Sequence, residues 1–435
     1  MSQLPDGWVI TNLGSVMSVS SGKGLPKKNM VEGEVPVFGG NGITGYHDSP
    51  NVFEKTIAIG RVGYYCGSVH LTPSRAWITD NAFLTNFIQK YLSKNYLFKL
   101  LGATNLRGDD SSTAQPVISG RKIYPIEIRL PPLAEQKVIA QKLDTLLAQV
   151  ETTKARLDRI PDILKRFRQS VLAAAVSGKL TEEWRGKVEL VGWDMQKLRD
   201  VVNSIEAGKN LKCIEIPPKE NEFGIIKISA VTWGFYDESQ SKTLPSAELF
   251  LESRRVKVGD FLISRANTLE LLGNPVIVQK VSKNLMLSDK VLRLEMNDSD
   301  KRWVSIFLRS GEGRKEIESR STGNQMSMRN IGQKALLDIN IPKVPDKEQR
   351  QIVDIVETLF TYADTIEKQV QAAQARVNSL TQSILAKAFR GELTAEWRAA
   401  NSELISGENS AEALLEKIRA EREAVKPKLK TKSKA

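Results

Sequence analysis

The stretch GKLTEEWR at residues 178–185 recurs as GELTAEWR at residues 391–398, and this repeat organises the whole chain. The offset between the two copies is 213 residues (391 minus 178), and EQ at residues 135–136 recurs at 348–349 with the same offset. The segments between these anchors align without a gap. Self-similarity over this length predicts two tandem copies of one structural unit.

The beginning of each unit repeats more faintly. Gly7-Trp8 corresponds to Gly192-Trp193, an offset of 185 residues, so the length difference accumulates inside the unit. Each unit therefore has a divergent first part and a near-identical second part. We predict five segments: a first divergent domain at 1–130, a helical segment at 131–185, a second divergent domain at 186–340, a second helical segment at 341–400, and a C-terminal helix with a basic tail at 401–435.

The near-identical parts have the pattern of long helices. Apolar residues alternate in steps of four and three, which is typical of helices that supercoil on a partner helix. The predicted seam consists of Leu146, Val150, Leu157, Ile160, Leu164, Phe167, Val171, Leu359, Ile366, Val370, Val377, Leu380 and Ile384. We expect the two copies to pack on each other. The alternative is that each helix packs only on its own domain. Pro161 predicts a kink or a local opening in the first helix.

The divergent parts predict an α+β fold. Short β-branched runs such as residues 55–59 and 261–263 stand between Gly, Pro and Asn turn signals. Polar loops separate these runs. We therefore expect two α/β domains attached to two long helices that pair as a coiled coil, with an internal pseudo-twofold repeat.

The charge of the chain favours a polyanionic partner. Formal net charge is +12 over 435 residues, with 63 Lys and Arg against 51 Asp and Glu. Such a balance is typical of proteins that neutralise phosphates, although it also occurs in proteins that are merely basic. Five lysines without an acidic residue lie in the tail, at Lys426, Lys428, Lys430, Lys432 and Lys434. This tail predicts either a solvated disordered segment or non-specific phosphate contacts.

Cysteine and histidine are too few for a metal site or a disulfide framework. The chain has Cys66, Cys213, His47 and His70, with no metal-ligand spacing. We expect no bound metal and a reducing compartment. No charged-then-apolar leader opens the sequence and no apolar run is long enough to span a bilayer, so we expect a cytoplasmic protein.

No motif in the sequence predicts catalysis. Residues 40–45 match G-x-G-x-x-G, but a helix start does not follow, so the motif predicts a turn and not a dinucleotide site. Neither histidine has a recognisable nucleophile or orienting partner. We find no phosphate loop, nuclease metal motif or methyltransferase cofactor loop. The sequence therefore predicts a recognition protein with no catalytic residues and no cofactor of its own.

Several stretches together resemble the specificity subunit of type I restriction–modification enzymes, and their sequence motifs are similar to those of the IA subfamily. They are LPPLAEQ at 130–136, ILKRFRQ at 163–169, residues 178–185, FTYADTIEK at 360–368, residues 381–398 and LISGENS at 404–410. The resemblance covers the whole architecture. The divergent parts match only in pattern.

The resemblance implies a division of labour. Each divergent part would be a target recognition domain that reads one half of a bipartite double-stranded DNA site, and the antiparallel helix pair would set the spacing. Two modification subunits would methylate adenine with S-adenosylmethionine, and two restriction subunits would use ATP and magnesium in host defence. This chain would be the non-catalytic recognition subunit that docks them.

The family motifs do not identify the DNA-contacting residues. Polar and basic loop residues can donate to base edges and phosphates, but the same composition occurs in idle surface loops. The candidates are Lys23, Lys27, Lys28, Asn41, Tyr46, Arg107, Gln115, Arg121, Lys209, Lys212, Arg265, Asn267, Asn324, Gln325 and Arg329. For partner-subunit contacts we predict Trp184, Arg185, Trp397 and Arg398. The alternative is that these tryptophans cap the helix pair.

Two other functions remain compatible with parts of the sequence. A scaffold that assembles other proteins through the coiled coil would show no salt-sensitive, sequence-dependent binding to duplex DNA. A fused restriction enzyme with its own nuclease would cleave DNA when the purified chain is supplied with magnesium.

Overall fold

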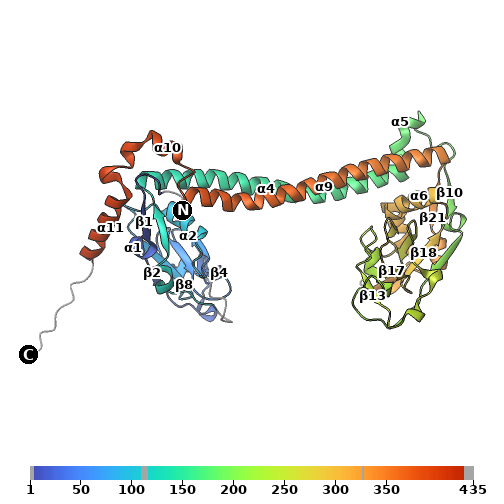
Figure 1. Ribbon diagram of the computed structural model, residues 1–435, viewed down its shortest axis with the longest axis horizontal. Coiled ribbons are helices and arrows are strands. Elements are labelled where there is room, and N and C mark those ends of the chain that lie inside the picture. The colour runs from blue at the N-terminus through green and yellow to red at the C-terminus, as the bar shows by residue number, and fades with distance from the viewer. Residues whose placement is uncertain (1–3, 109–115, 326–327, 426–435) are drawn as a thin grey trace, which may run out of the picture. The chain divides into compact units, whose positions relative to one another are not determined.

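The computed structural model describes residues 4–108, 116–325 and 328–425, and the chain forms two compact units. Unit 1 comprises residues 1–157 and 373–435, and unit 2 comprises residues 158–372. In each unit a β-rich domain lies beside segments of two long helices, labelled α4 and α9 in Figure 1. The amino-terminal part of α4 and the carboxyl-terminal part of α9 belong to unit 1, and the remainder of both helices belongs to unit 2.

The two long helices have equal length and matching positions in the repeat. Helix α4 spans Leu133–Val176 and helix α9 spans Asp346–Phe389, 44 residues each. Both boundaries differ by 213 residues, which is the offset of the sequence repeat. Helix α4 continues through Pro161, so this proline does not end the helix.

Within each unit the helical segments pack antiparallel. In unit 1 the Lys142 ammonium, near the start of α4, donates to the carbonyl of Leu393, just beyond the end of α9, at 3.1 Å. In unit 2 Arg168, near the end of α4, forms ion pairs of 2.6 and 2.9 Å with Asp364 and Glu367. The prediction that the two repeated helices pack on each other is confirmed. The predicted seam side chains are buried or half-buried, except Leu380, which is 46% exposed.

Unit 1 contains two main sheets and a short β-ribbon. One sheet has the order β2-β8-β5-β6, the other has the order β4-β3-β7, and β1 pairs with β9 where the chain enters α4. The strands are β1 Val9–Asn12, β2 Met17–Ser21, β3 Val35–Gly39, β4 Gly42–His47, β5 Ile57–Gly60, β6 Val69–Leu71, β7 Trp77–Ile78, β8 Ala82–Phe87 and β9 Glu127–Leu130. The short helices are α1 Leu13–Val16, α2 Lys94–Ala103 and α3 Gly120–Ile123.

Unit 2 repeats this topology. Its sheets have the orders β11-β18-β14-β16 and β13-β12-β17, and β10 pairs with β21 before α9. Unit 2 also contains a further sheet, in which the strand order is β15-β20-β19. The strands are β10 Asp194–Lys197, β11 Ser204–Ala207, β12 Phe223–Ile226, β13 Ser241–Thr243, β14 Phe261–Ser264, β15 Ala266–Asn267, β16 Pro275–Ile277, β17 Asn284–Met286, β18 Val291–Glu295, β19 Thr322–Gln325, β20 Met328–Asn330 and β21 Asn340–Lys343. The helices are α5 Glu182–Arg185, α6 Asp298–Arg309, α7 Gly311–Arg320 and α8 Gln333–Leu337.

Strand register makes the correspondence between the two domains specific. Ile59 of β5 pairs with Phe83 of β8, and Phe83 also pairs with Ser21 at the end of β2. In unit 2 Ile263 of β14 pairs with Leu292 of β18, and Leu292 also pairs with Ala207 at the end of β11. The ends of β2 and β11 are therefore equivalent positions, as are the ends of β5 and β14. The α+β expectation is confirmed, with one sheet topology used twice.

Each domain is anchored to its own helical segments by an apolar core. In unit 1 Tyr96, Leu97 and Leu101 of α2 share a buried cluster with Ile139 and Leu143 of α4. In unit 2 a corresponding cluster joins α6, the sheet and the first turns of α9, through Trp303, Phe307, Ile352, Val353 and Val356. Burial of such side chains contributes about 1.5–3 kcal/mol each, so each domain is fixed on its helix.

The C-terminal segment belongs to unit 1. Helix α10 spans Ala395–Ala400, and helix α11 spans Ala411–Val425. Leu414, Leu415 and Ile418 of α11 lie in the core of unit 1, and the Arg422 guanidinium donates to the carbonyl of Gly14 at 2.7 Å. The lysines of the basic tail, from Lys426 onward, lie outside the described residues. Among the described helices, none is sufficiently long and apolar to cross a membrane.

Candidate nucleic-acid interface

A buried carboxylate at the start of α4 joins three segments of unit 1. Glu135 accepts hydrogen bonds from Trp8 Nε1 at 2.8 Å, Thr394 Oγ1 at 2.6 Å and the Arg398 guanidinium at 2.6 Å. Arg398 also donates to the carbonyl of Gly391 at 3.0 Å, and Gly391 has a φ of +80°, which favours glycine. A buried charge is stable only when it is paired and hydrogen-bonded. The cluster therefore fixes the N-terminal segment, α4 and the segment after α9 to one another.

Unit 2 contains the same cluster built from the other copies. Glu348 accepts hydrogen bonds from Trp193 Nε1 at 3.0 Å and Thr181 Oγ1 at 2.7 Å, and it forms an ion pair with Arg185. Arg185 also donates to the carbonyl of Gly178, at 3.3 Å, where φ is +71°. We call these groups the glutamate clusters. In each, the start of one helix meets the end of the other, so the antiparallel pairing explains why both repeat anchors are retained.

The residues predicted to contact partner subunits divide into two kinds. The guanidinium groups of Arg185 and Arg398 are committed to the glutamate clusters, with side chains only 8% and 13% exposed. Trp184 is half exposed and Trp397 is half-buried. The arginines therefore hold each unit together, whereas Trp184 is accessible at its surface.

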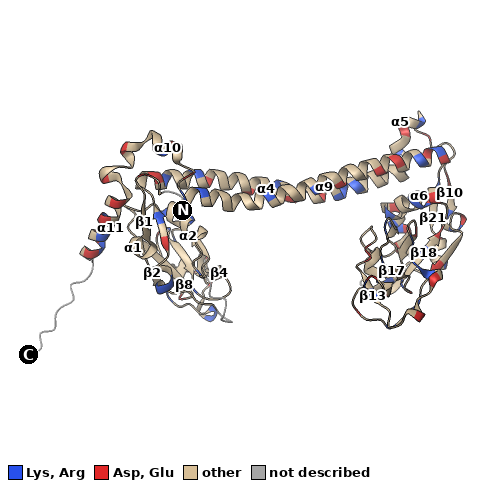
Figure 2. Ribbon diagram, in the orientation of Figure 1, with Lys and Arg blue, Asp and Glu red and all other residues tan. Residues whose placement is uncertain are grey.

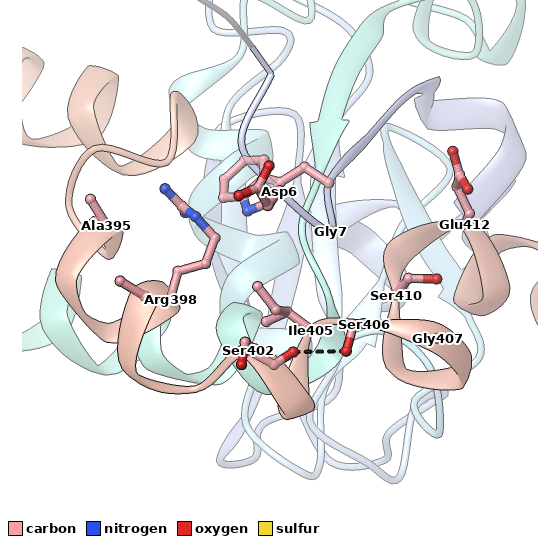
Figure 3. Close-up of a pocket in the computed structure, with 12 residues that line it drawn as sticks. Asp6, Gly7, Ala395, Arg398, Ser402, Ile405, Ser406, Gly407, Ser410 and Glu412 are labelled. Atoms are coloured by element: carbon pink, nitrogen blue, oxygen red, sulfur yellow. Dashed lines mark hydrogen bonds between the residues drawn. The ribbon is translucent and has the colours of Figure 1, made fainter.

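A cavity of about 920 Å³ adjoins the glutamate cluster of unit 1. Figure 3 shows it between the N-terminal segment at Asp6 and Gly7 and the C-terminal segment that carries Arg398, Ile405 and Ser410. In unit 2 the chain runs directly from Arg185 to Trp193, so the residues from 399 to 425 have no counterpart there. The C-terminal segment distinguishes unit 1 from unit 2.

The carboxyl ends of β2 and β5 bring several predicted DNA-binding residues of unit 1 together. The Arg61 guanidinium donates to Ser21 Oγ at 3.0 Å, directly before Gly22-Lys23. The turn Gly40-Asn41 joins β3 to β4, as predicted for the G-x-G-x-x-G motif, and Ser68 Oγ donates to the carbonyl of Gly40 at 3.3 Å. We call this region, with residues 61–68, the strand-end surface of unit 1. It contains Lys23 and Asn41.

Two exposed tyrosines project from this surface. Tyr64 and Tyr65 are 75% and 57% exposed, and their rings meet edge to face with centroids 5.0 Å apart. Their loop is held by a turn bond from Cys66 N–H to the carbonyl of Gly63, at 2.9 Å, and Arg107 donates to the carbonyl of Tyr64 at 3.4 Å. Exposed aromatic and arginine side chains are typical of binding surfaces. Arg107 therefore joins the strand-end surface.

Unit 2 forms the equivalent strand-end surface at β11 and β14. It comprises Gly208-Lys209, residues 265–274 and the paired strands β19 and β20. Asn267 of β15 pairs with Arg329 of β20, and Asn267 Nδ2 donates to Thr232 Oγ1 at 3.2 Å. The Arg329 guanidinium donates to Ser321 Oγ at 2.8 Å and to the Ser321 carbonyl at 3.0 Å, so it links β20 to the start of β19. This surface brings together Lys209, Arg265, Asn267 and Arg329.

Other predicted residues lie elsewhere or cannot be placed. Tyr46 is 55% exposed at the far end of β4 from the Gly40-Asn41 turn, and Lys27 and Lys28 lie in a short 3-10 turn. Arg121 is exposed on α3, and Lys212 is exposed in the segment after Lys209. Gln115 lies outside the described residues. Asn324 and Gln325 belong to β19, but their side chains also lie outside the described part of the structure.

Sequence reasoning missed Arg61 and the tyrosine pair. Aligning residues 57–61 with 261–265 would have placed Arg61 opposite the chosen Arg265, because both follow a buried β-run. The tyrosines stand between Gly63 and Gly67, whose φ angles are +90° and +88°. Glycines on both sides of an aromatic pair are a turn signal that could have identified the loop.

The histidines and cysteines have structural environments. His47 is buried, accepts the N–H of Val31 at 3.0 Å on Nδ1 and meets the Trp77 ring edge to face. Burial lowers the pKa of His70, whose Nε2 lies 3.1 Å from Ser68 Oγ. Cys66 and Cys213 are free thiols. Within the ranges described above, no three His, Cys, Asp or Glu side chains are placed to hold a metal ion.

Lysine and arginine are mixed with acidic residues along the two long helices, as Figure 2 shows. A mixed surface of this kind is typical of solvated helices and gives no continuous track for a phosphate backbone. The strand-end surfaces are therefore the best candidates for nucleic-acid contacts in both units.

Comparison with known proteins agrees with this architecture. The family model described as type I restriction modification DNA specificity domain matches residues 5–162 and 191–373. The type I restriction enzyme EcoKI specificity subunit of Escherichia coli K12 is 42% identical over 370 residues, covering 83% of this chain and 75% of the relative. The EcoBI specificity subunit of Escherichia coli is 36% identical over 454 residues, covering 96% and 93% of the two chains.

Two solved structures share the fold. A chain from a study of complex assembly and conformational transition of the type I R-M system has a TM-score of 0.67 and 19% identity, covering 90% of this chain and 100% of that one. The HsdS subunit from Thermoanaerobacter tengcongensis has a TM-score of 0.56 and 20% identity, covering 90% and 98%. The chain belongs to the family of type I restriction–modification specificity subunits, which are DNA-recognition subunits and not enzymes.

Proposed function

We propose that each unit reads one half of a bipartite DNA site and that α4 and α9 set the spacing between the halves. The observation that carries this proposal is the use of one sheet topology twice, with the same glutamate cluster under each domain and different loops at each strand-end surface. Equivalent frameworks would place the domains on DNA in equivalent ways. Different loops would then read different bases.

The loops differ in length as well as composition. The turn between β3 and β4 has two residues, whereas the equivalent connection between β12 and β13 runs from residue 227 to 240 and includes a 3-10 turn at Ile228–Val231. Bases are distinguished by the hydrogen-bonding pattern of their edges in the grooves, so different loops would specify different letters.

The proposed spacing function rests on the continuity of the two helices. Each has 44 residues, which corresponds to about 66 Å at about 1.5 Å per residue. The chain passes between the two units only at residues 157–158 and 372–373, both inside these helices. Helix length would therefore control the gap between the two half-sites.

We further propose that the chain docks two modification subunits and two restriction subunits. Two equivalent copies of a surface predict two equivalent contacts, as in symmetric assemblies. Adenine methylation with S-adenosylmethionine, and translocation and cleavage with ATP and magnesium, would then belong to those partners. Trp184 is the accessible member of the residues proposed for these contacts. We expect the protein to act in the cytoplasm.

The experiment that tests the proposal is a methylome. The chain is expressed with modification subunits of the matching subfamily in a host that lacks adenine methylation, and modified bases are mapped by single-molecule sequencing. Two short specific sequences around a fixed gap are expected. Absence of new methylation, with co-purification of the subunits demonstrated, would instead support a scaffold that does not read DNA.

A further inference from the structure

The two domains, although divergent, carry the same Gly-Lys pair at the same structural position. Gly22-Lys23 follows the last residue of β2, and Gly208-Lys209 follows the last residue of β11, at register positions shown above to be equivalent. A Cβ on Gly22 would collide with the carbonyl of Ile78, and a Cβ on Gly208 would collide with the carbonyl of Leu287. The same close approach of the backbone thus requires glycine in both units and directs the next residue, a lysine, onto the strand-end surface.

An arginine follows the neighbouring strand in both units. The backbone N–H of Arg61 donates to the carbonyl of Asn81, and that of Arg265 donates to the carbonyl of Lys290, each at 2.9 Å. Their own carbonyls accept from Ile118 at 2.9 Å and from Ile331 at 3.0 Å. These matching bonds place the two arginines equivalently. In unit 1 the Arg61 guanidinium donates to Ser21 Oγ, at the end of β2. Arg61 and Lys23 therefore lie at the same end of this strand.

In unit 2 the lysine lines a polar pocket of about 470 Å³. Four lysines face two acidic residues in this pocket: Lys209, Lys227, Lys242 and Lys290 against Glu215 and Asp289. Glu215 binds Lys242 at 2.6 Å, and this contact lowers the pKa of Glu215. Ser288 also lines the pocket, and its buried hydroxyl has no hydrogen-bond partner among the described residues. The pocket thus has excess positive charge and an unused polar group.

Neither Lys23 nor Lys209 forms an ion pair with any residue of the described ranges. The Lys23 ammonium lies 5.8 Å from the centre of the Trp77 ring, and Lys209 is exposed. A lysine without an internal acidic partner keeps its charge available for a ligand. The residues around these shared cations differ between the units, as the tyrosine pair of unit 1 illustrates.

We propose that Lys23 with Arg61, and Lys209 with Arg265, each hold a backbone phosphate of DNA at the same position in the two half-sites. Phosphates are the same in every sequence, whereas base edges are not, so residues shared by two divergent domains suit the invariant part of the ligand. This inference rests on the proposed function and adds to it a division between anchoring cations and reading loops.

The test compares Lys23→Ala and Lys209→Ala with two matched lysine variants, using the full chain with its modification subunits. Lys137→Ala on α4 and Lys334→Ala on α8 remove the same charge from exposed positions outside the strand-end surfaces. Affinity is measured over a series of salt concentrations, for a duplex that carries the methylated motif and for a scrambled duplex. Thermal unfolding of each variant confirms that the fold is retained.

We expect Lys23→Ala and Lys209→Ala each to weaken binding to both duplexes by the same factor, and to reduce the magnitude of the negative slope of log affinity against log salt by about 1. The methylated motif should stay unchanged. If Lys23→Ala and Lys209→Ala kept the wild-type slope, or had the same slope as the control variants, the proposal would be overturned. A changed letter in the motif would also overturn it, because the lysine would then read a base. Failure of the wild-type complex to recognise any split motif would contradict the proposed function itself and is therefore distinguishable.

Discussion

The glutamate clusters are nearly the same in the two units, whereas the strand-end surfaces differ between them. Glu135 and Glu348 bind a tryptophan, a threonine and an arginine in the same geometry. At the strand ends, the features that the two units share among the described residues are the Gly-Lys pair and one arginine, while loop lengths and exposed side chains differ. The framework that holds each domain on its helices is therefore shared by the two units, whereas their strand-end surfaces differ.

Removing a central glutamate should produce the largest effect. Glu135→Gln and Glu348→Gln each leave a buried arginine without its charge partner, and loss of one partner of a buried pair costs about 3–5 kcal/mol. We expect calorimetry to show a similar loss for the two variants, each in its own unit. The control is Glu151→Gln, an exposed residue of α4, which should change stability by about 0.5 kcal/mol or less. Equal stability of all three variants would contradict the importance of the clusters.

Removing the exposed tyrosines should affect recognition and leave the framework intact. Tyr64→Ala with Tyr65→Ala removes two solvent-exposed rings, so unfolding should change little. If these rings contact bases, binding should weaken by about 1–3 kcal/mol for each base pair no longer read. Methylome mapping should show relaxation in one half of the motif only. Relaxation in both halves would show that the units do not read DNA independently.

Removing the hydrogen bonds between helix α11 and helix α1 should lower the stability of unit 1 and leave unit 2 unchanged. Arg422 donates to the carbonyls of Gly14 at 2.7 Å and Ser15 at 2.8 Å, and unit 2 has no counterpart. Arg422→Ala should lower the stability of unit 1 by about 1 kcal/mol, the usual worth of a partly exposed hydrogen-bonded group. Hydrogen exchange should report faster opening in α1 and α11, with unit 2 unaffected. Equal acceleration in both units would contradict a contact confined to unit 1.

The helices and the repeat could be predicted from the sequence because periodicity and self-similarity are local signals. The seam from Leu146 to Ile384 and the pairing of the two helices follow from such signals, whereas the antiparallel arrangement was implied by the family resemblance. The equivalence of Arg61 and Arg265 could not be seen in the same way, since it depends on strand pairing between residues far apart in the chain. The ion pairs of Arg185 and Arg398 could not be predicted from the sequence either, because only the folded chain brings each arginine to a glutamate more than 160 residues away.

The candidate DNA residues show the same limit. Choosing polar loop residues selected Lys23, Asn41, Arg107, Lys209, Arg265, Asn267 and Arg329, which the fold places at the strand-end surfaces of the two units. The same rule also selected Tyr46, Lys27 and Lys28, which lie at the other end of β4. Composition distinguishes loops from cores, but it does not show which loops share a face.

The central hypothesis is that two independent DNA-reading domains are separated by a helical spacer. Its most direct test inserts seven residues into both helices, after residue 157 in α4 and after residue 372 in α9, and maps the methylated motif. Seven residues preserve the apolar seam and add about 10 Å, which corresponds to about three base pairs. We predict unchanged half-sites with a longer gap. An unchanged gap, or altered letters in either half, would contradict the claim.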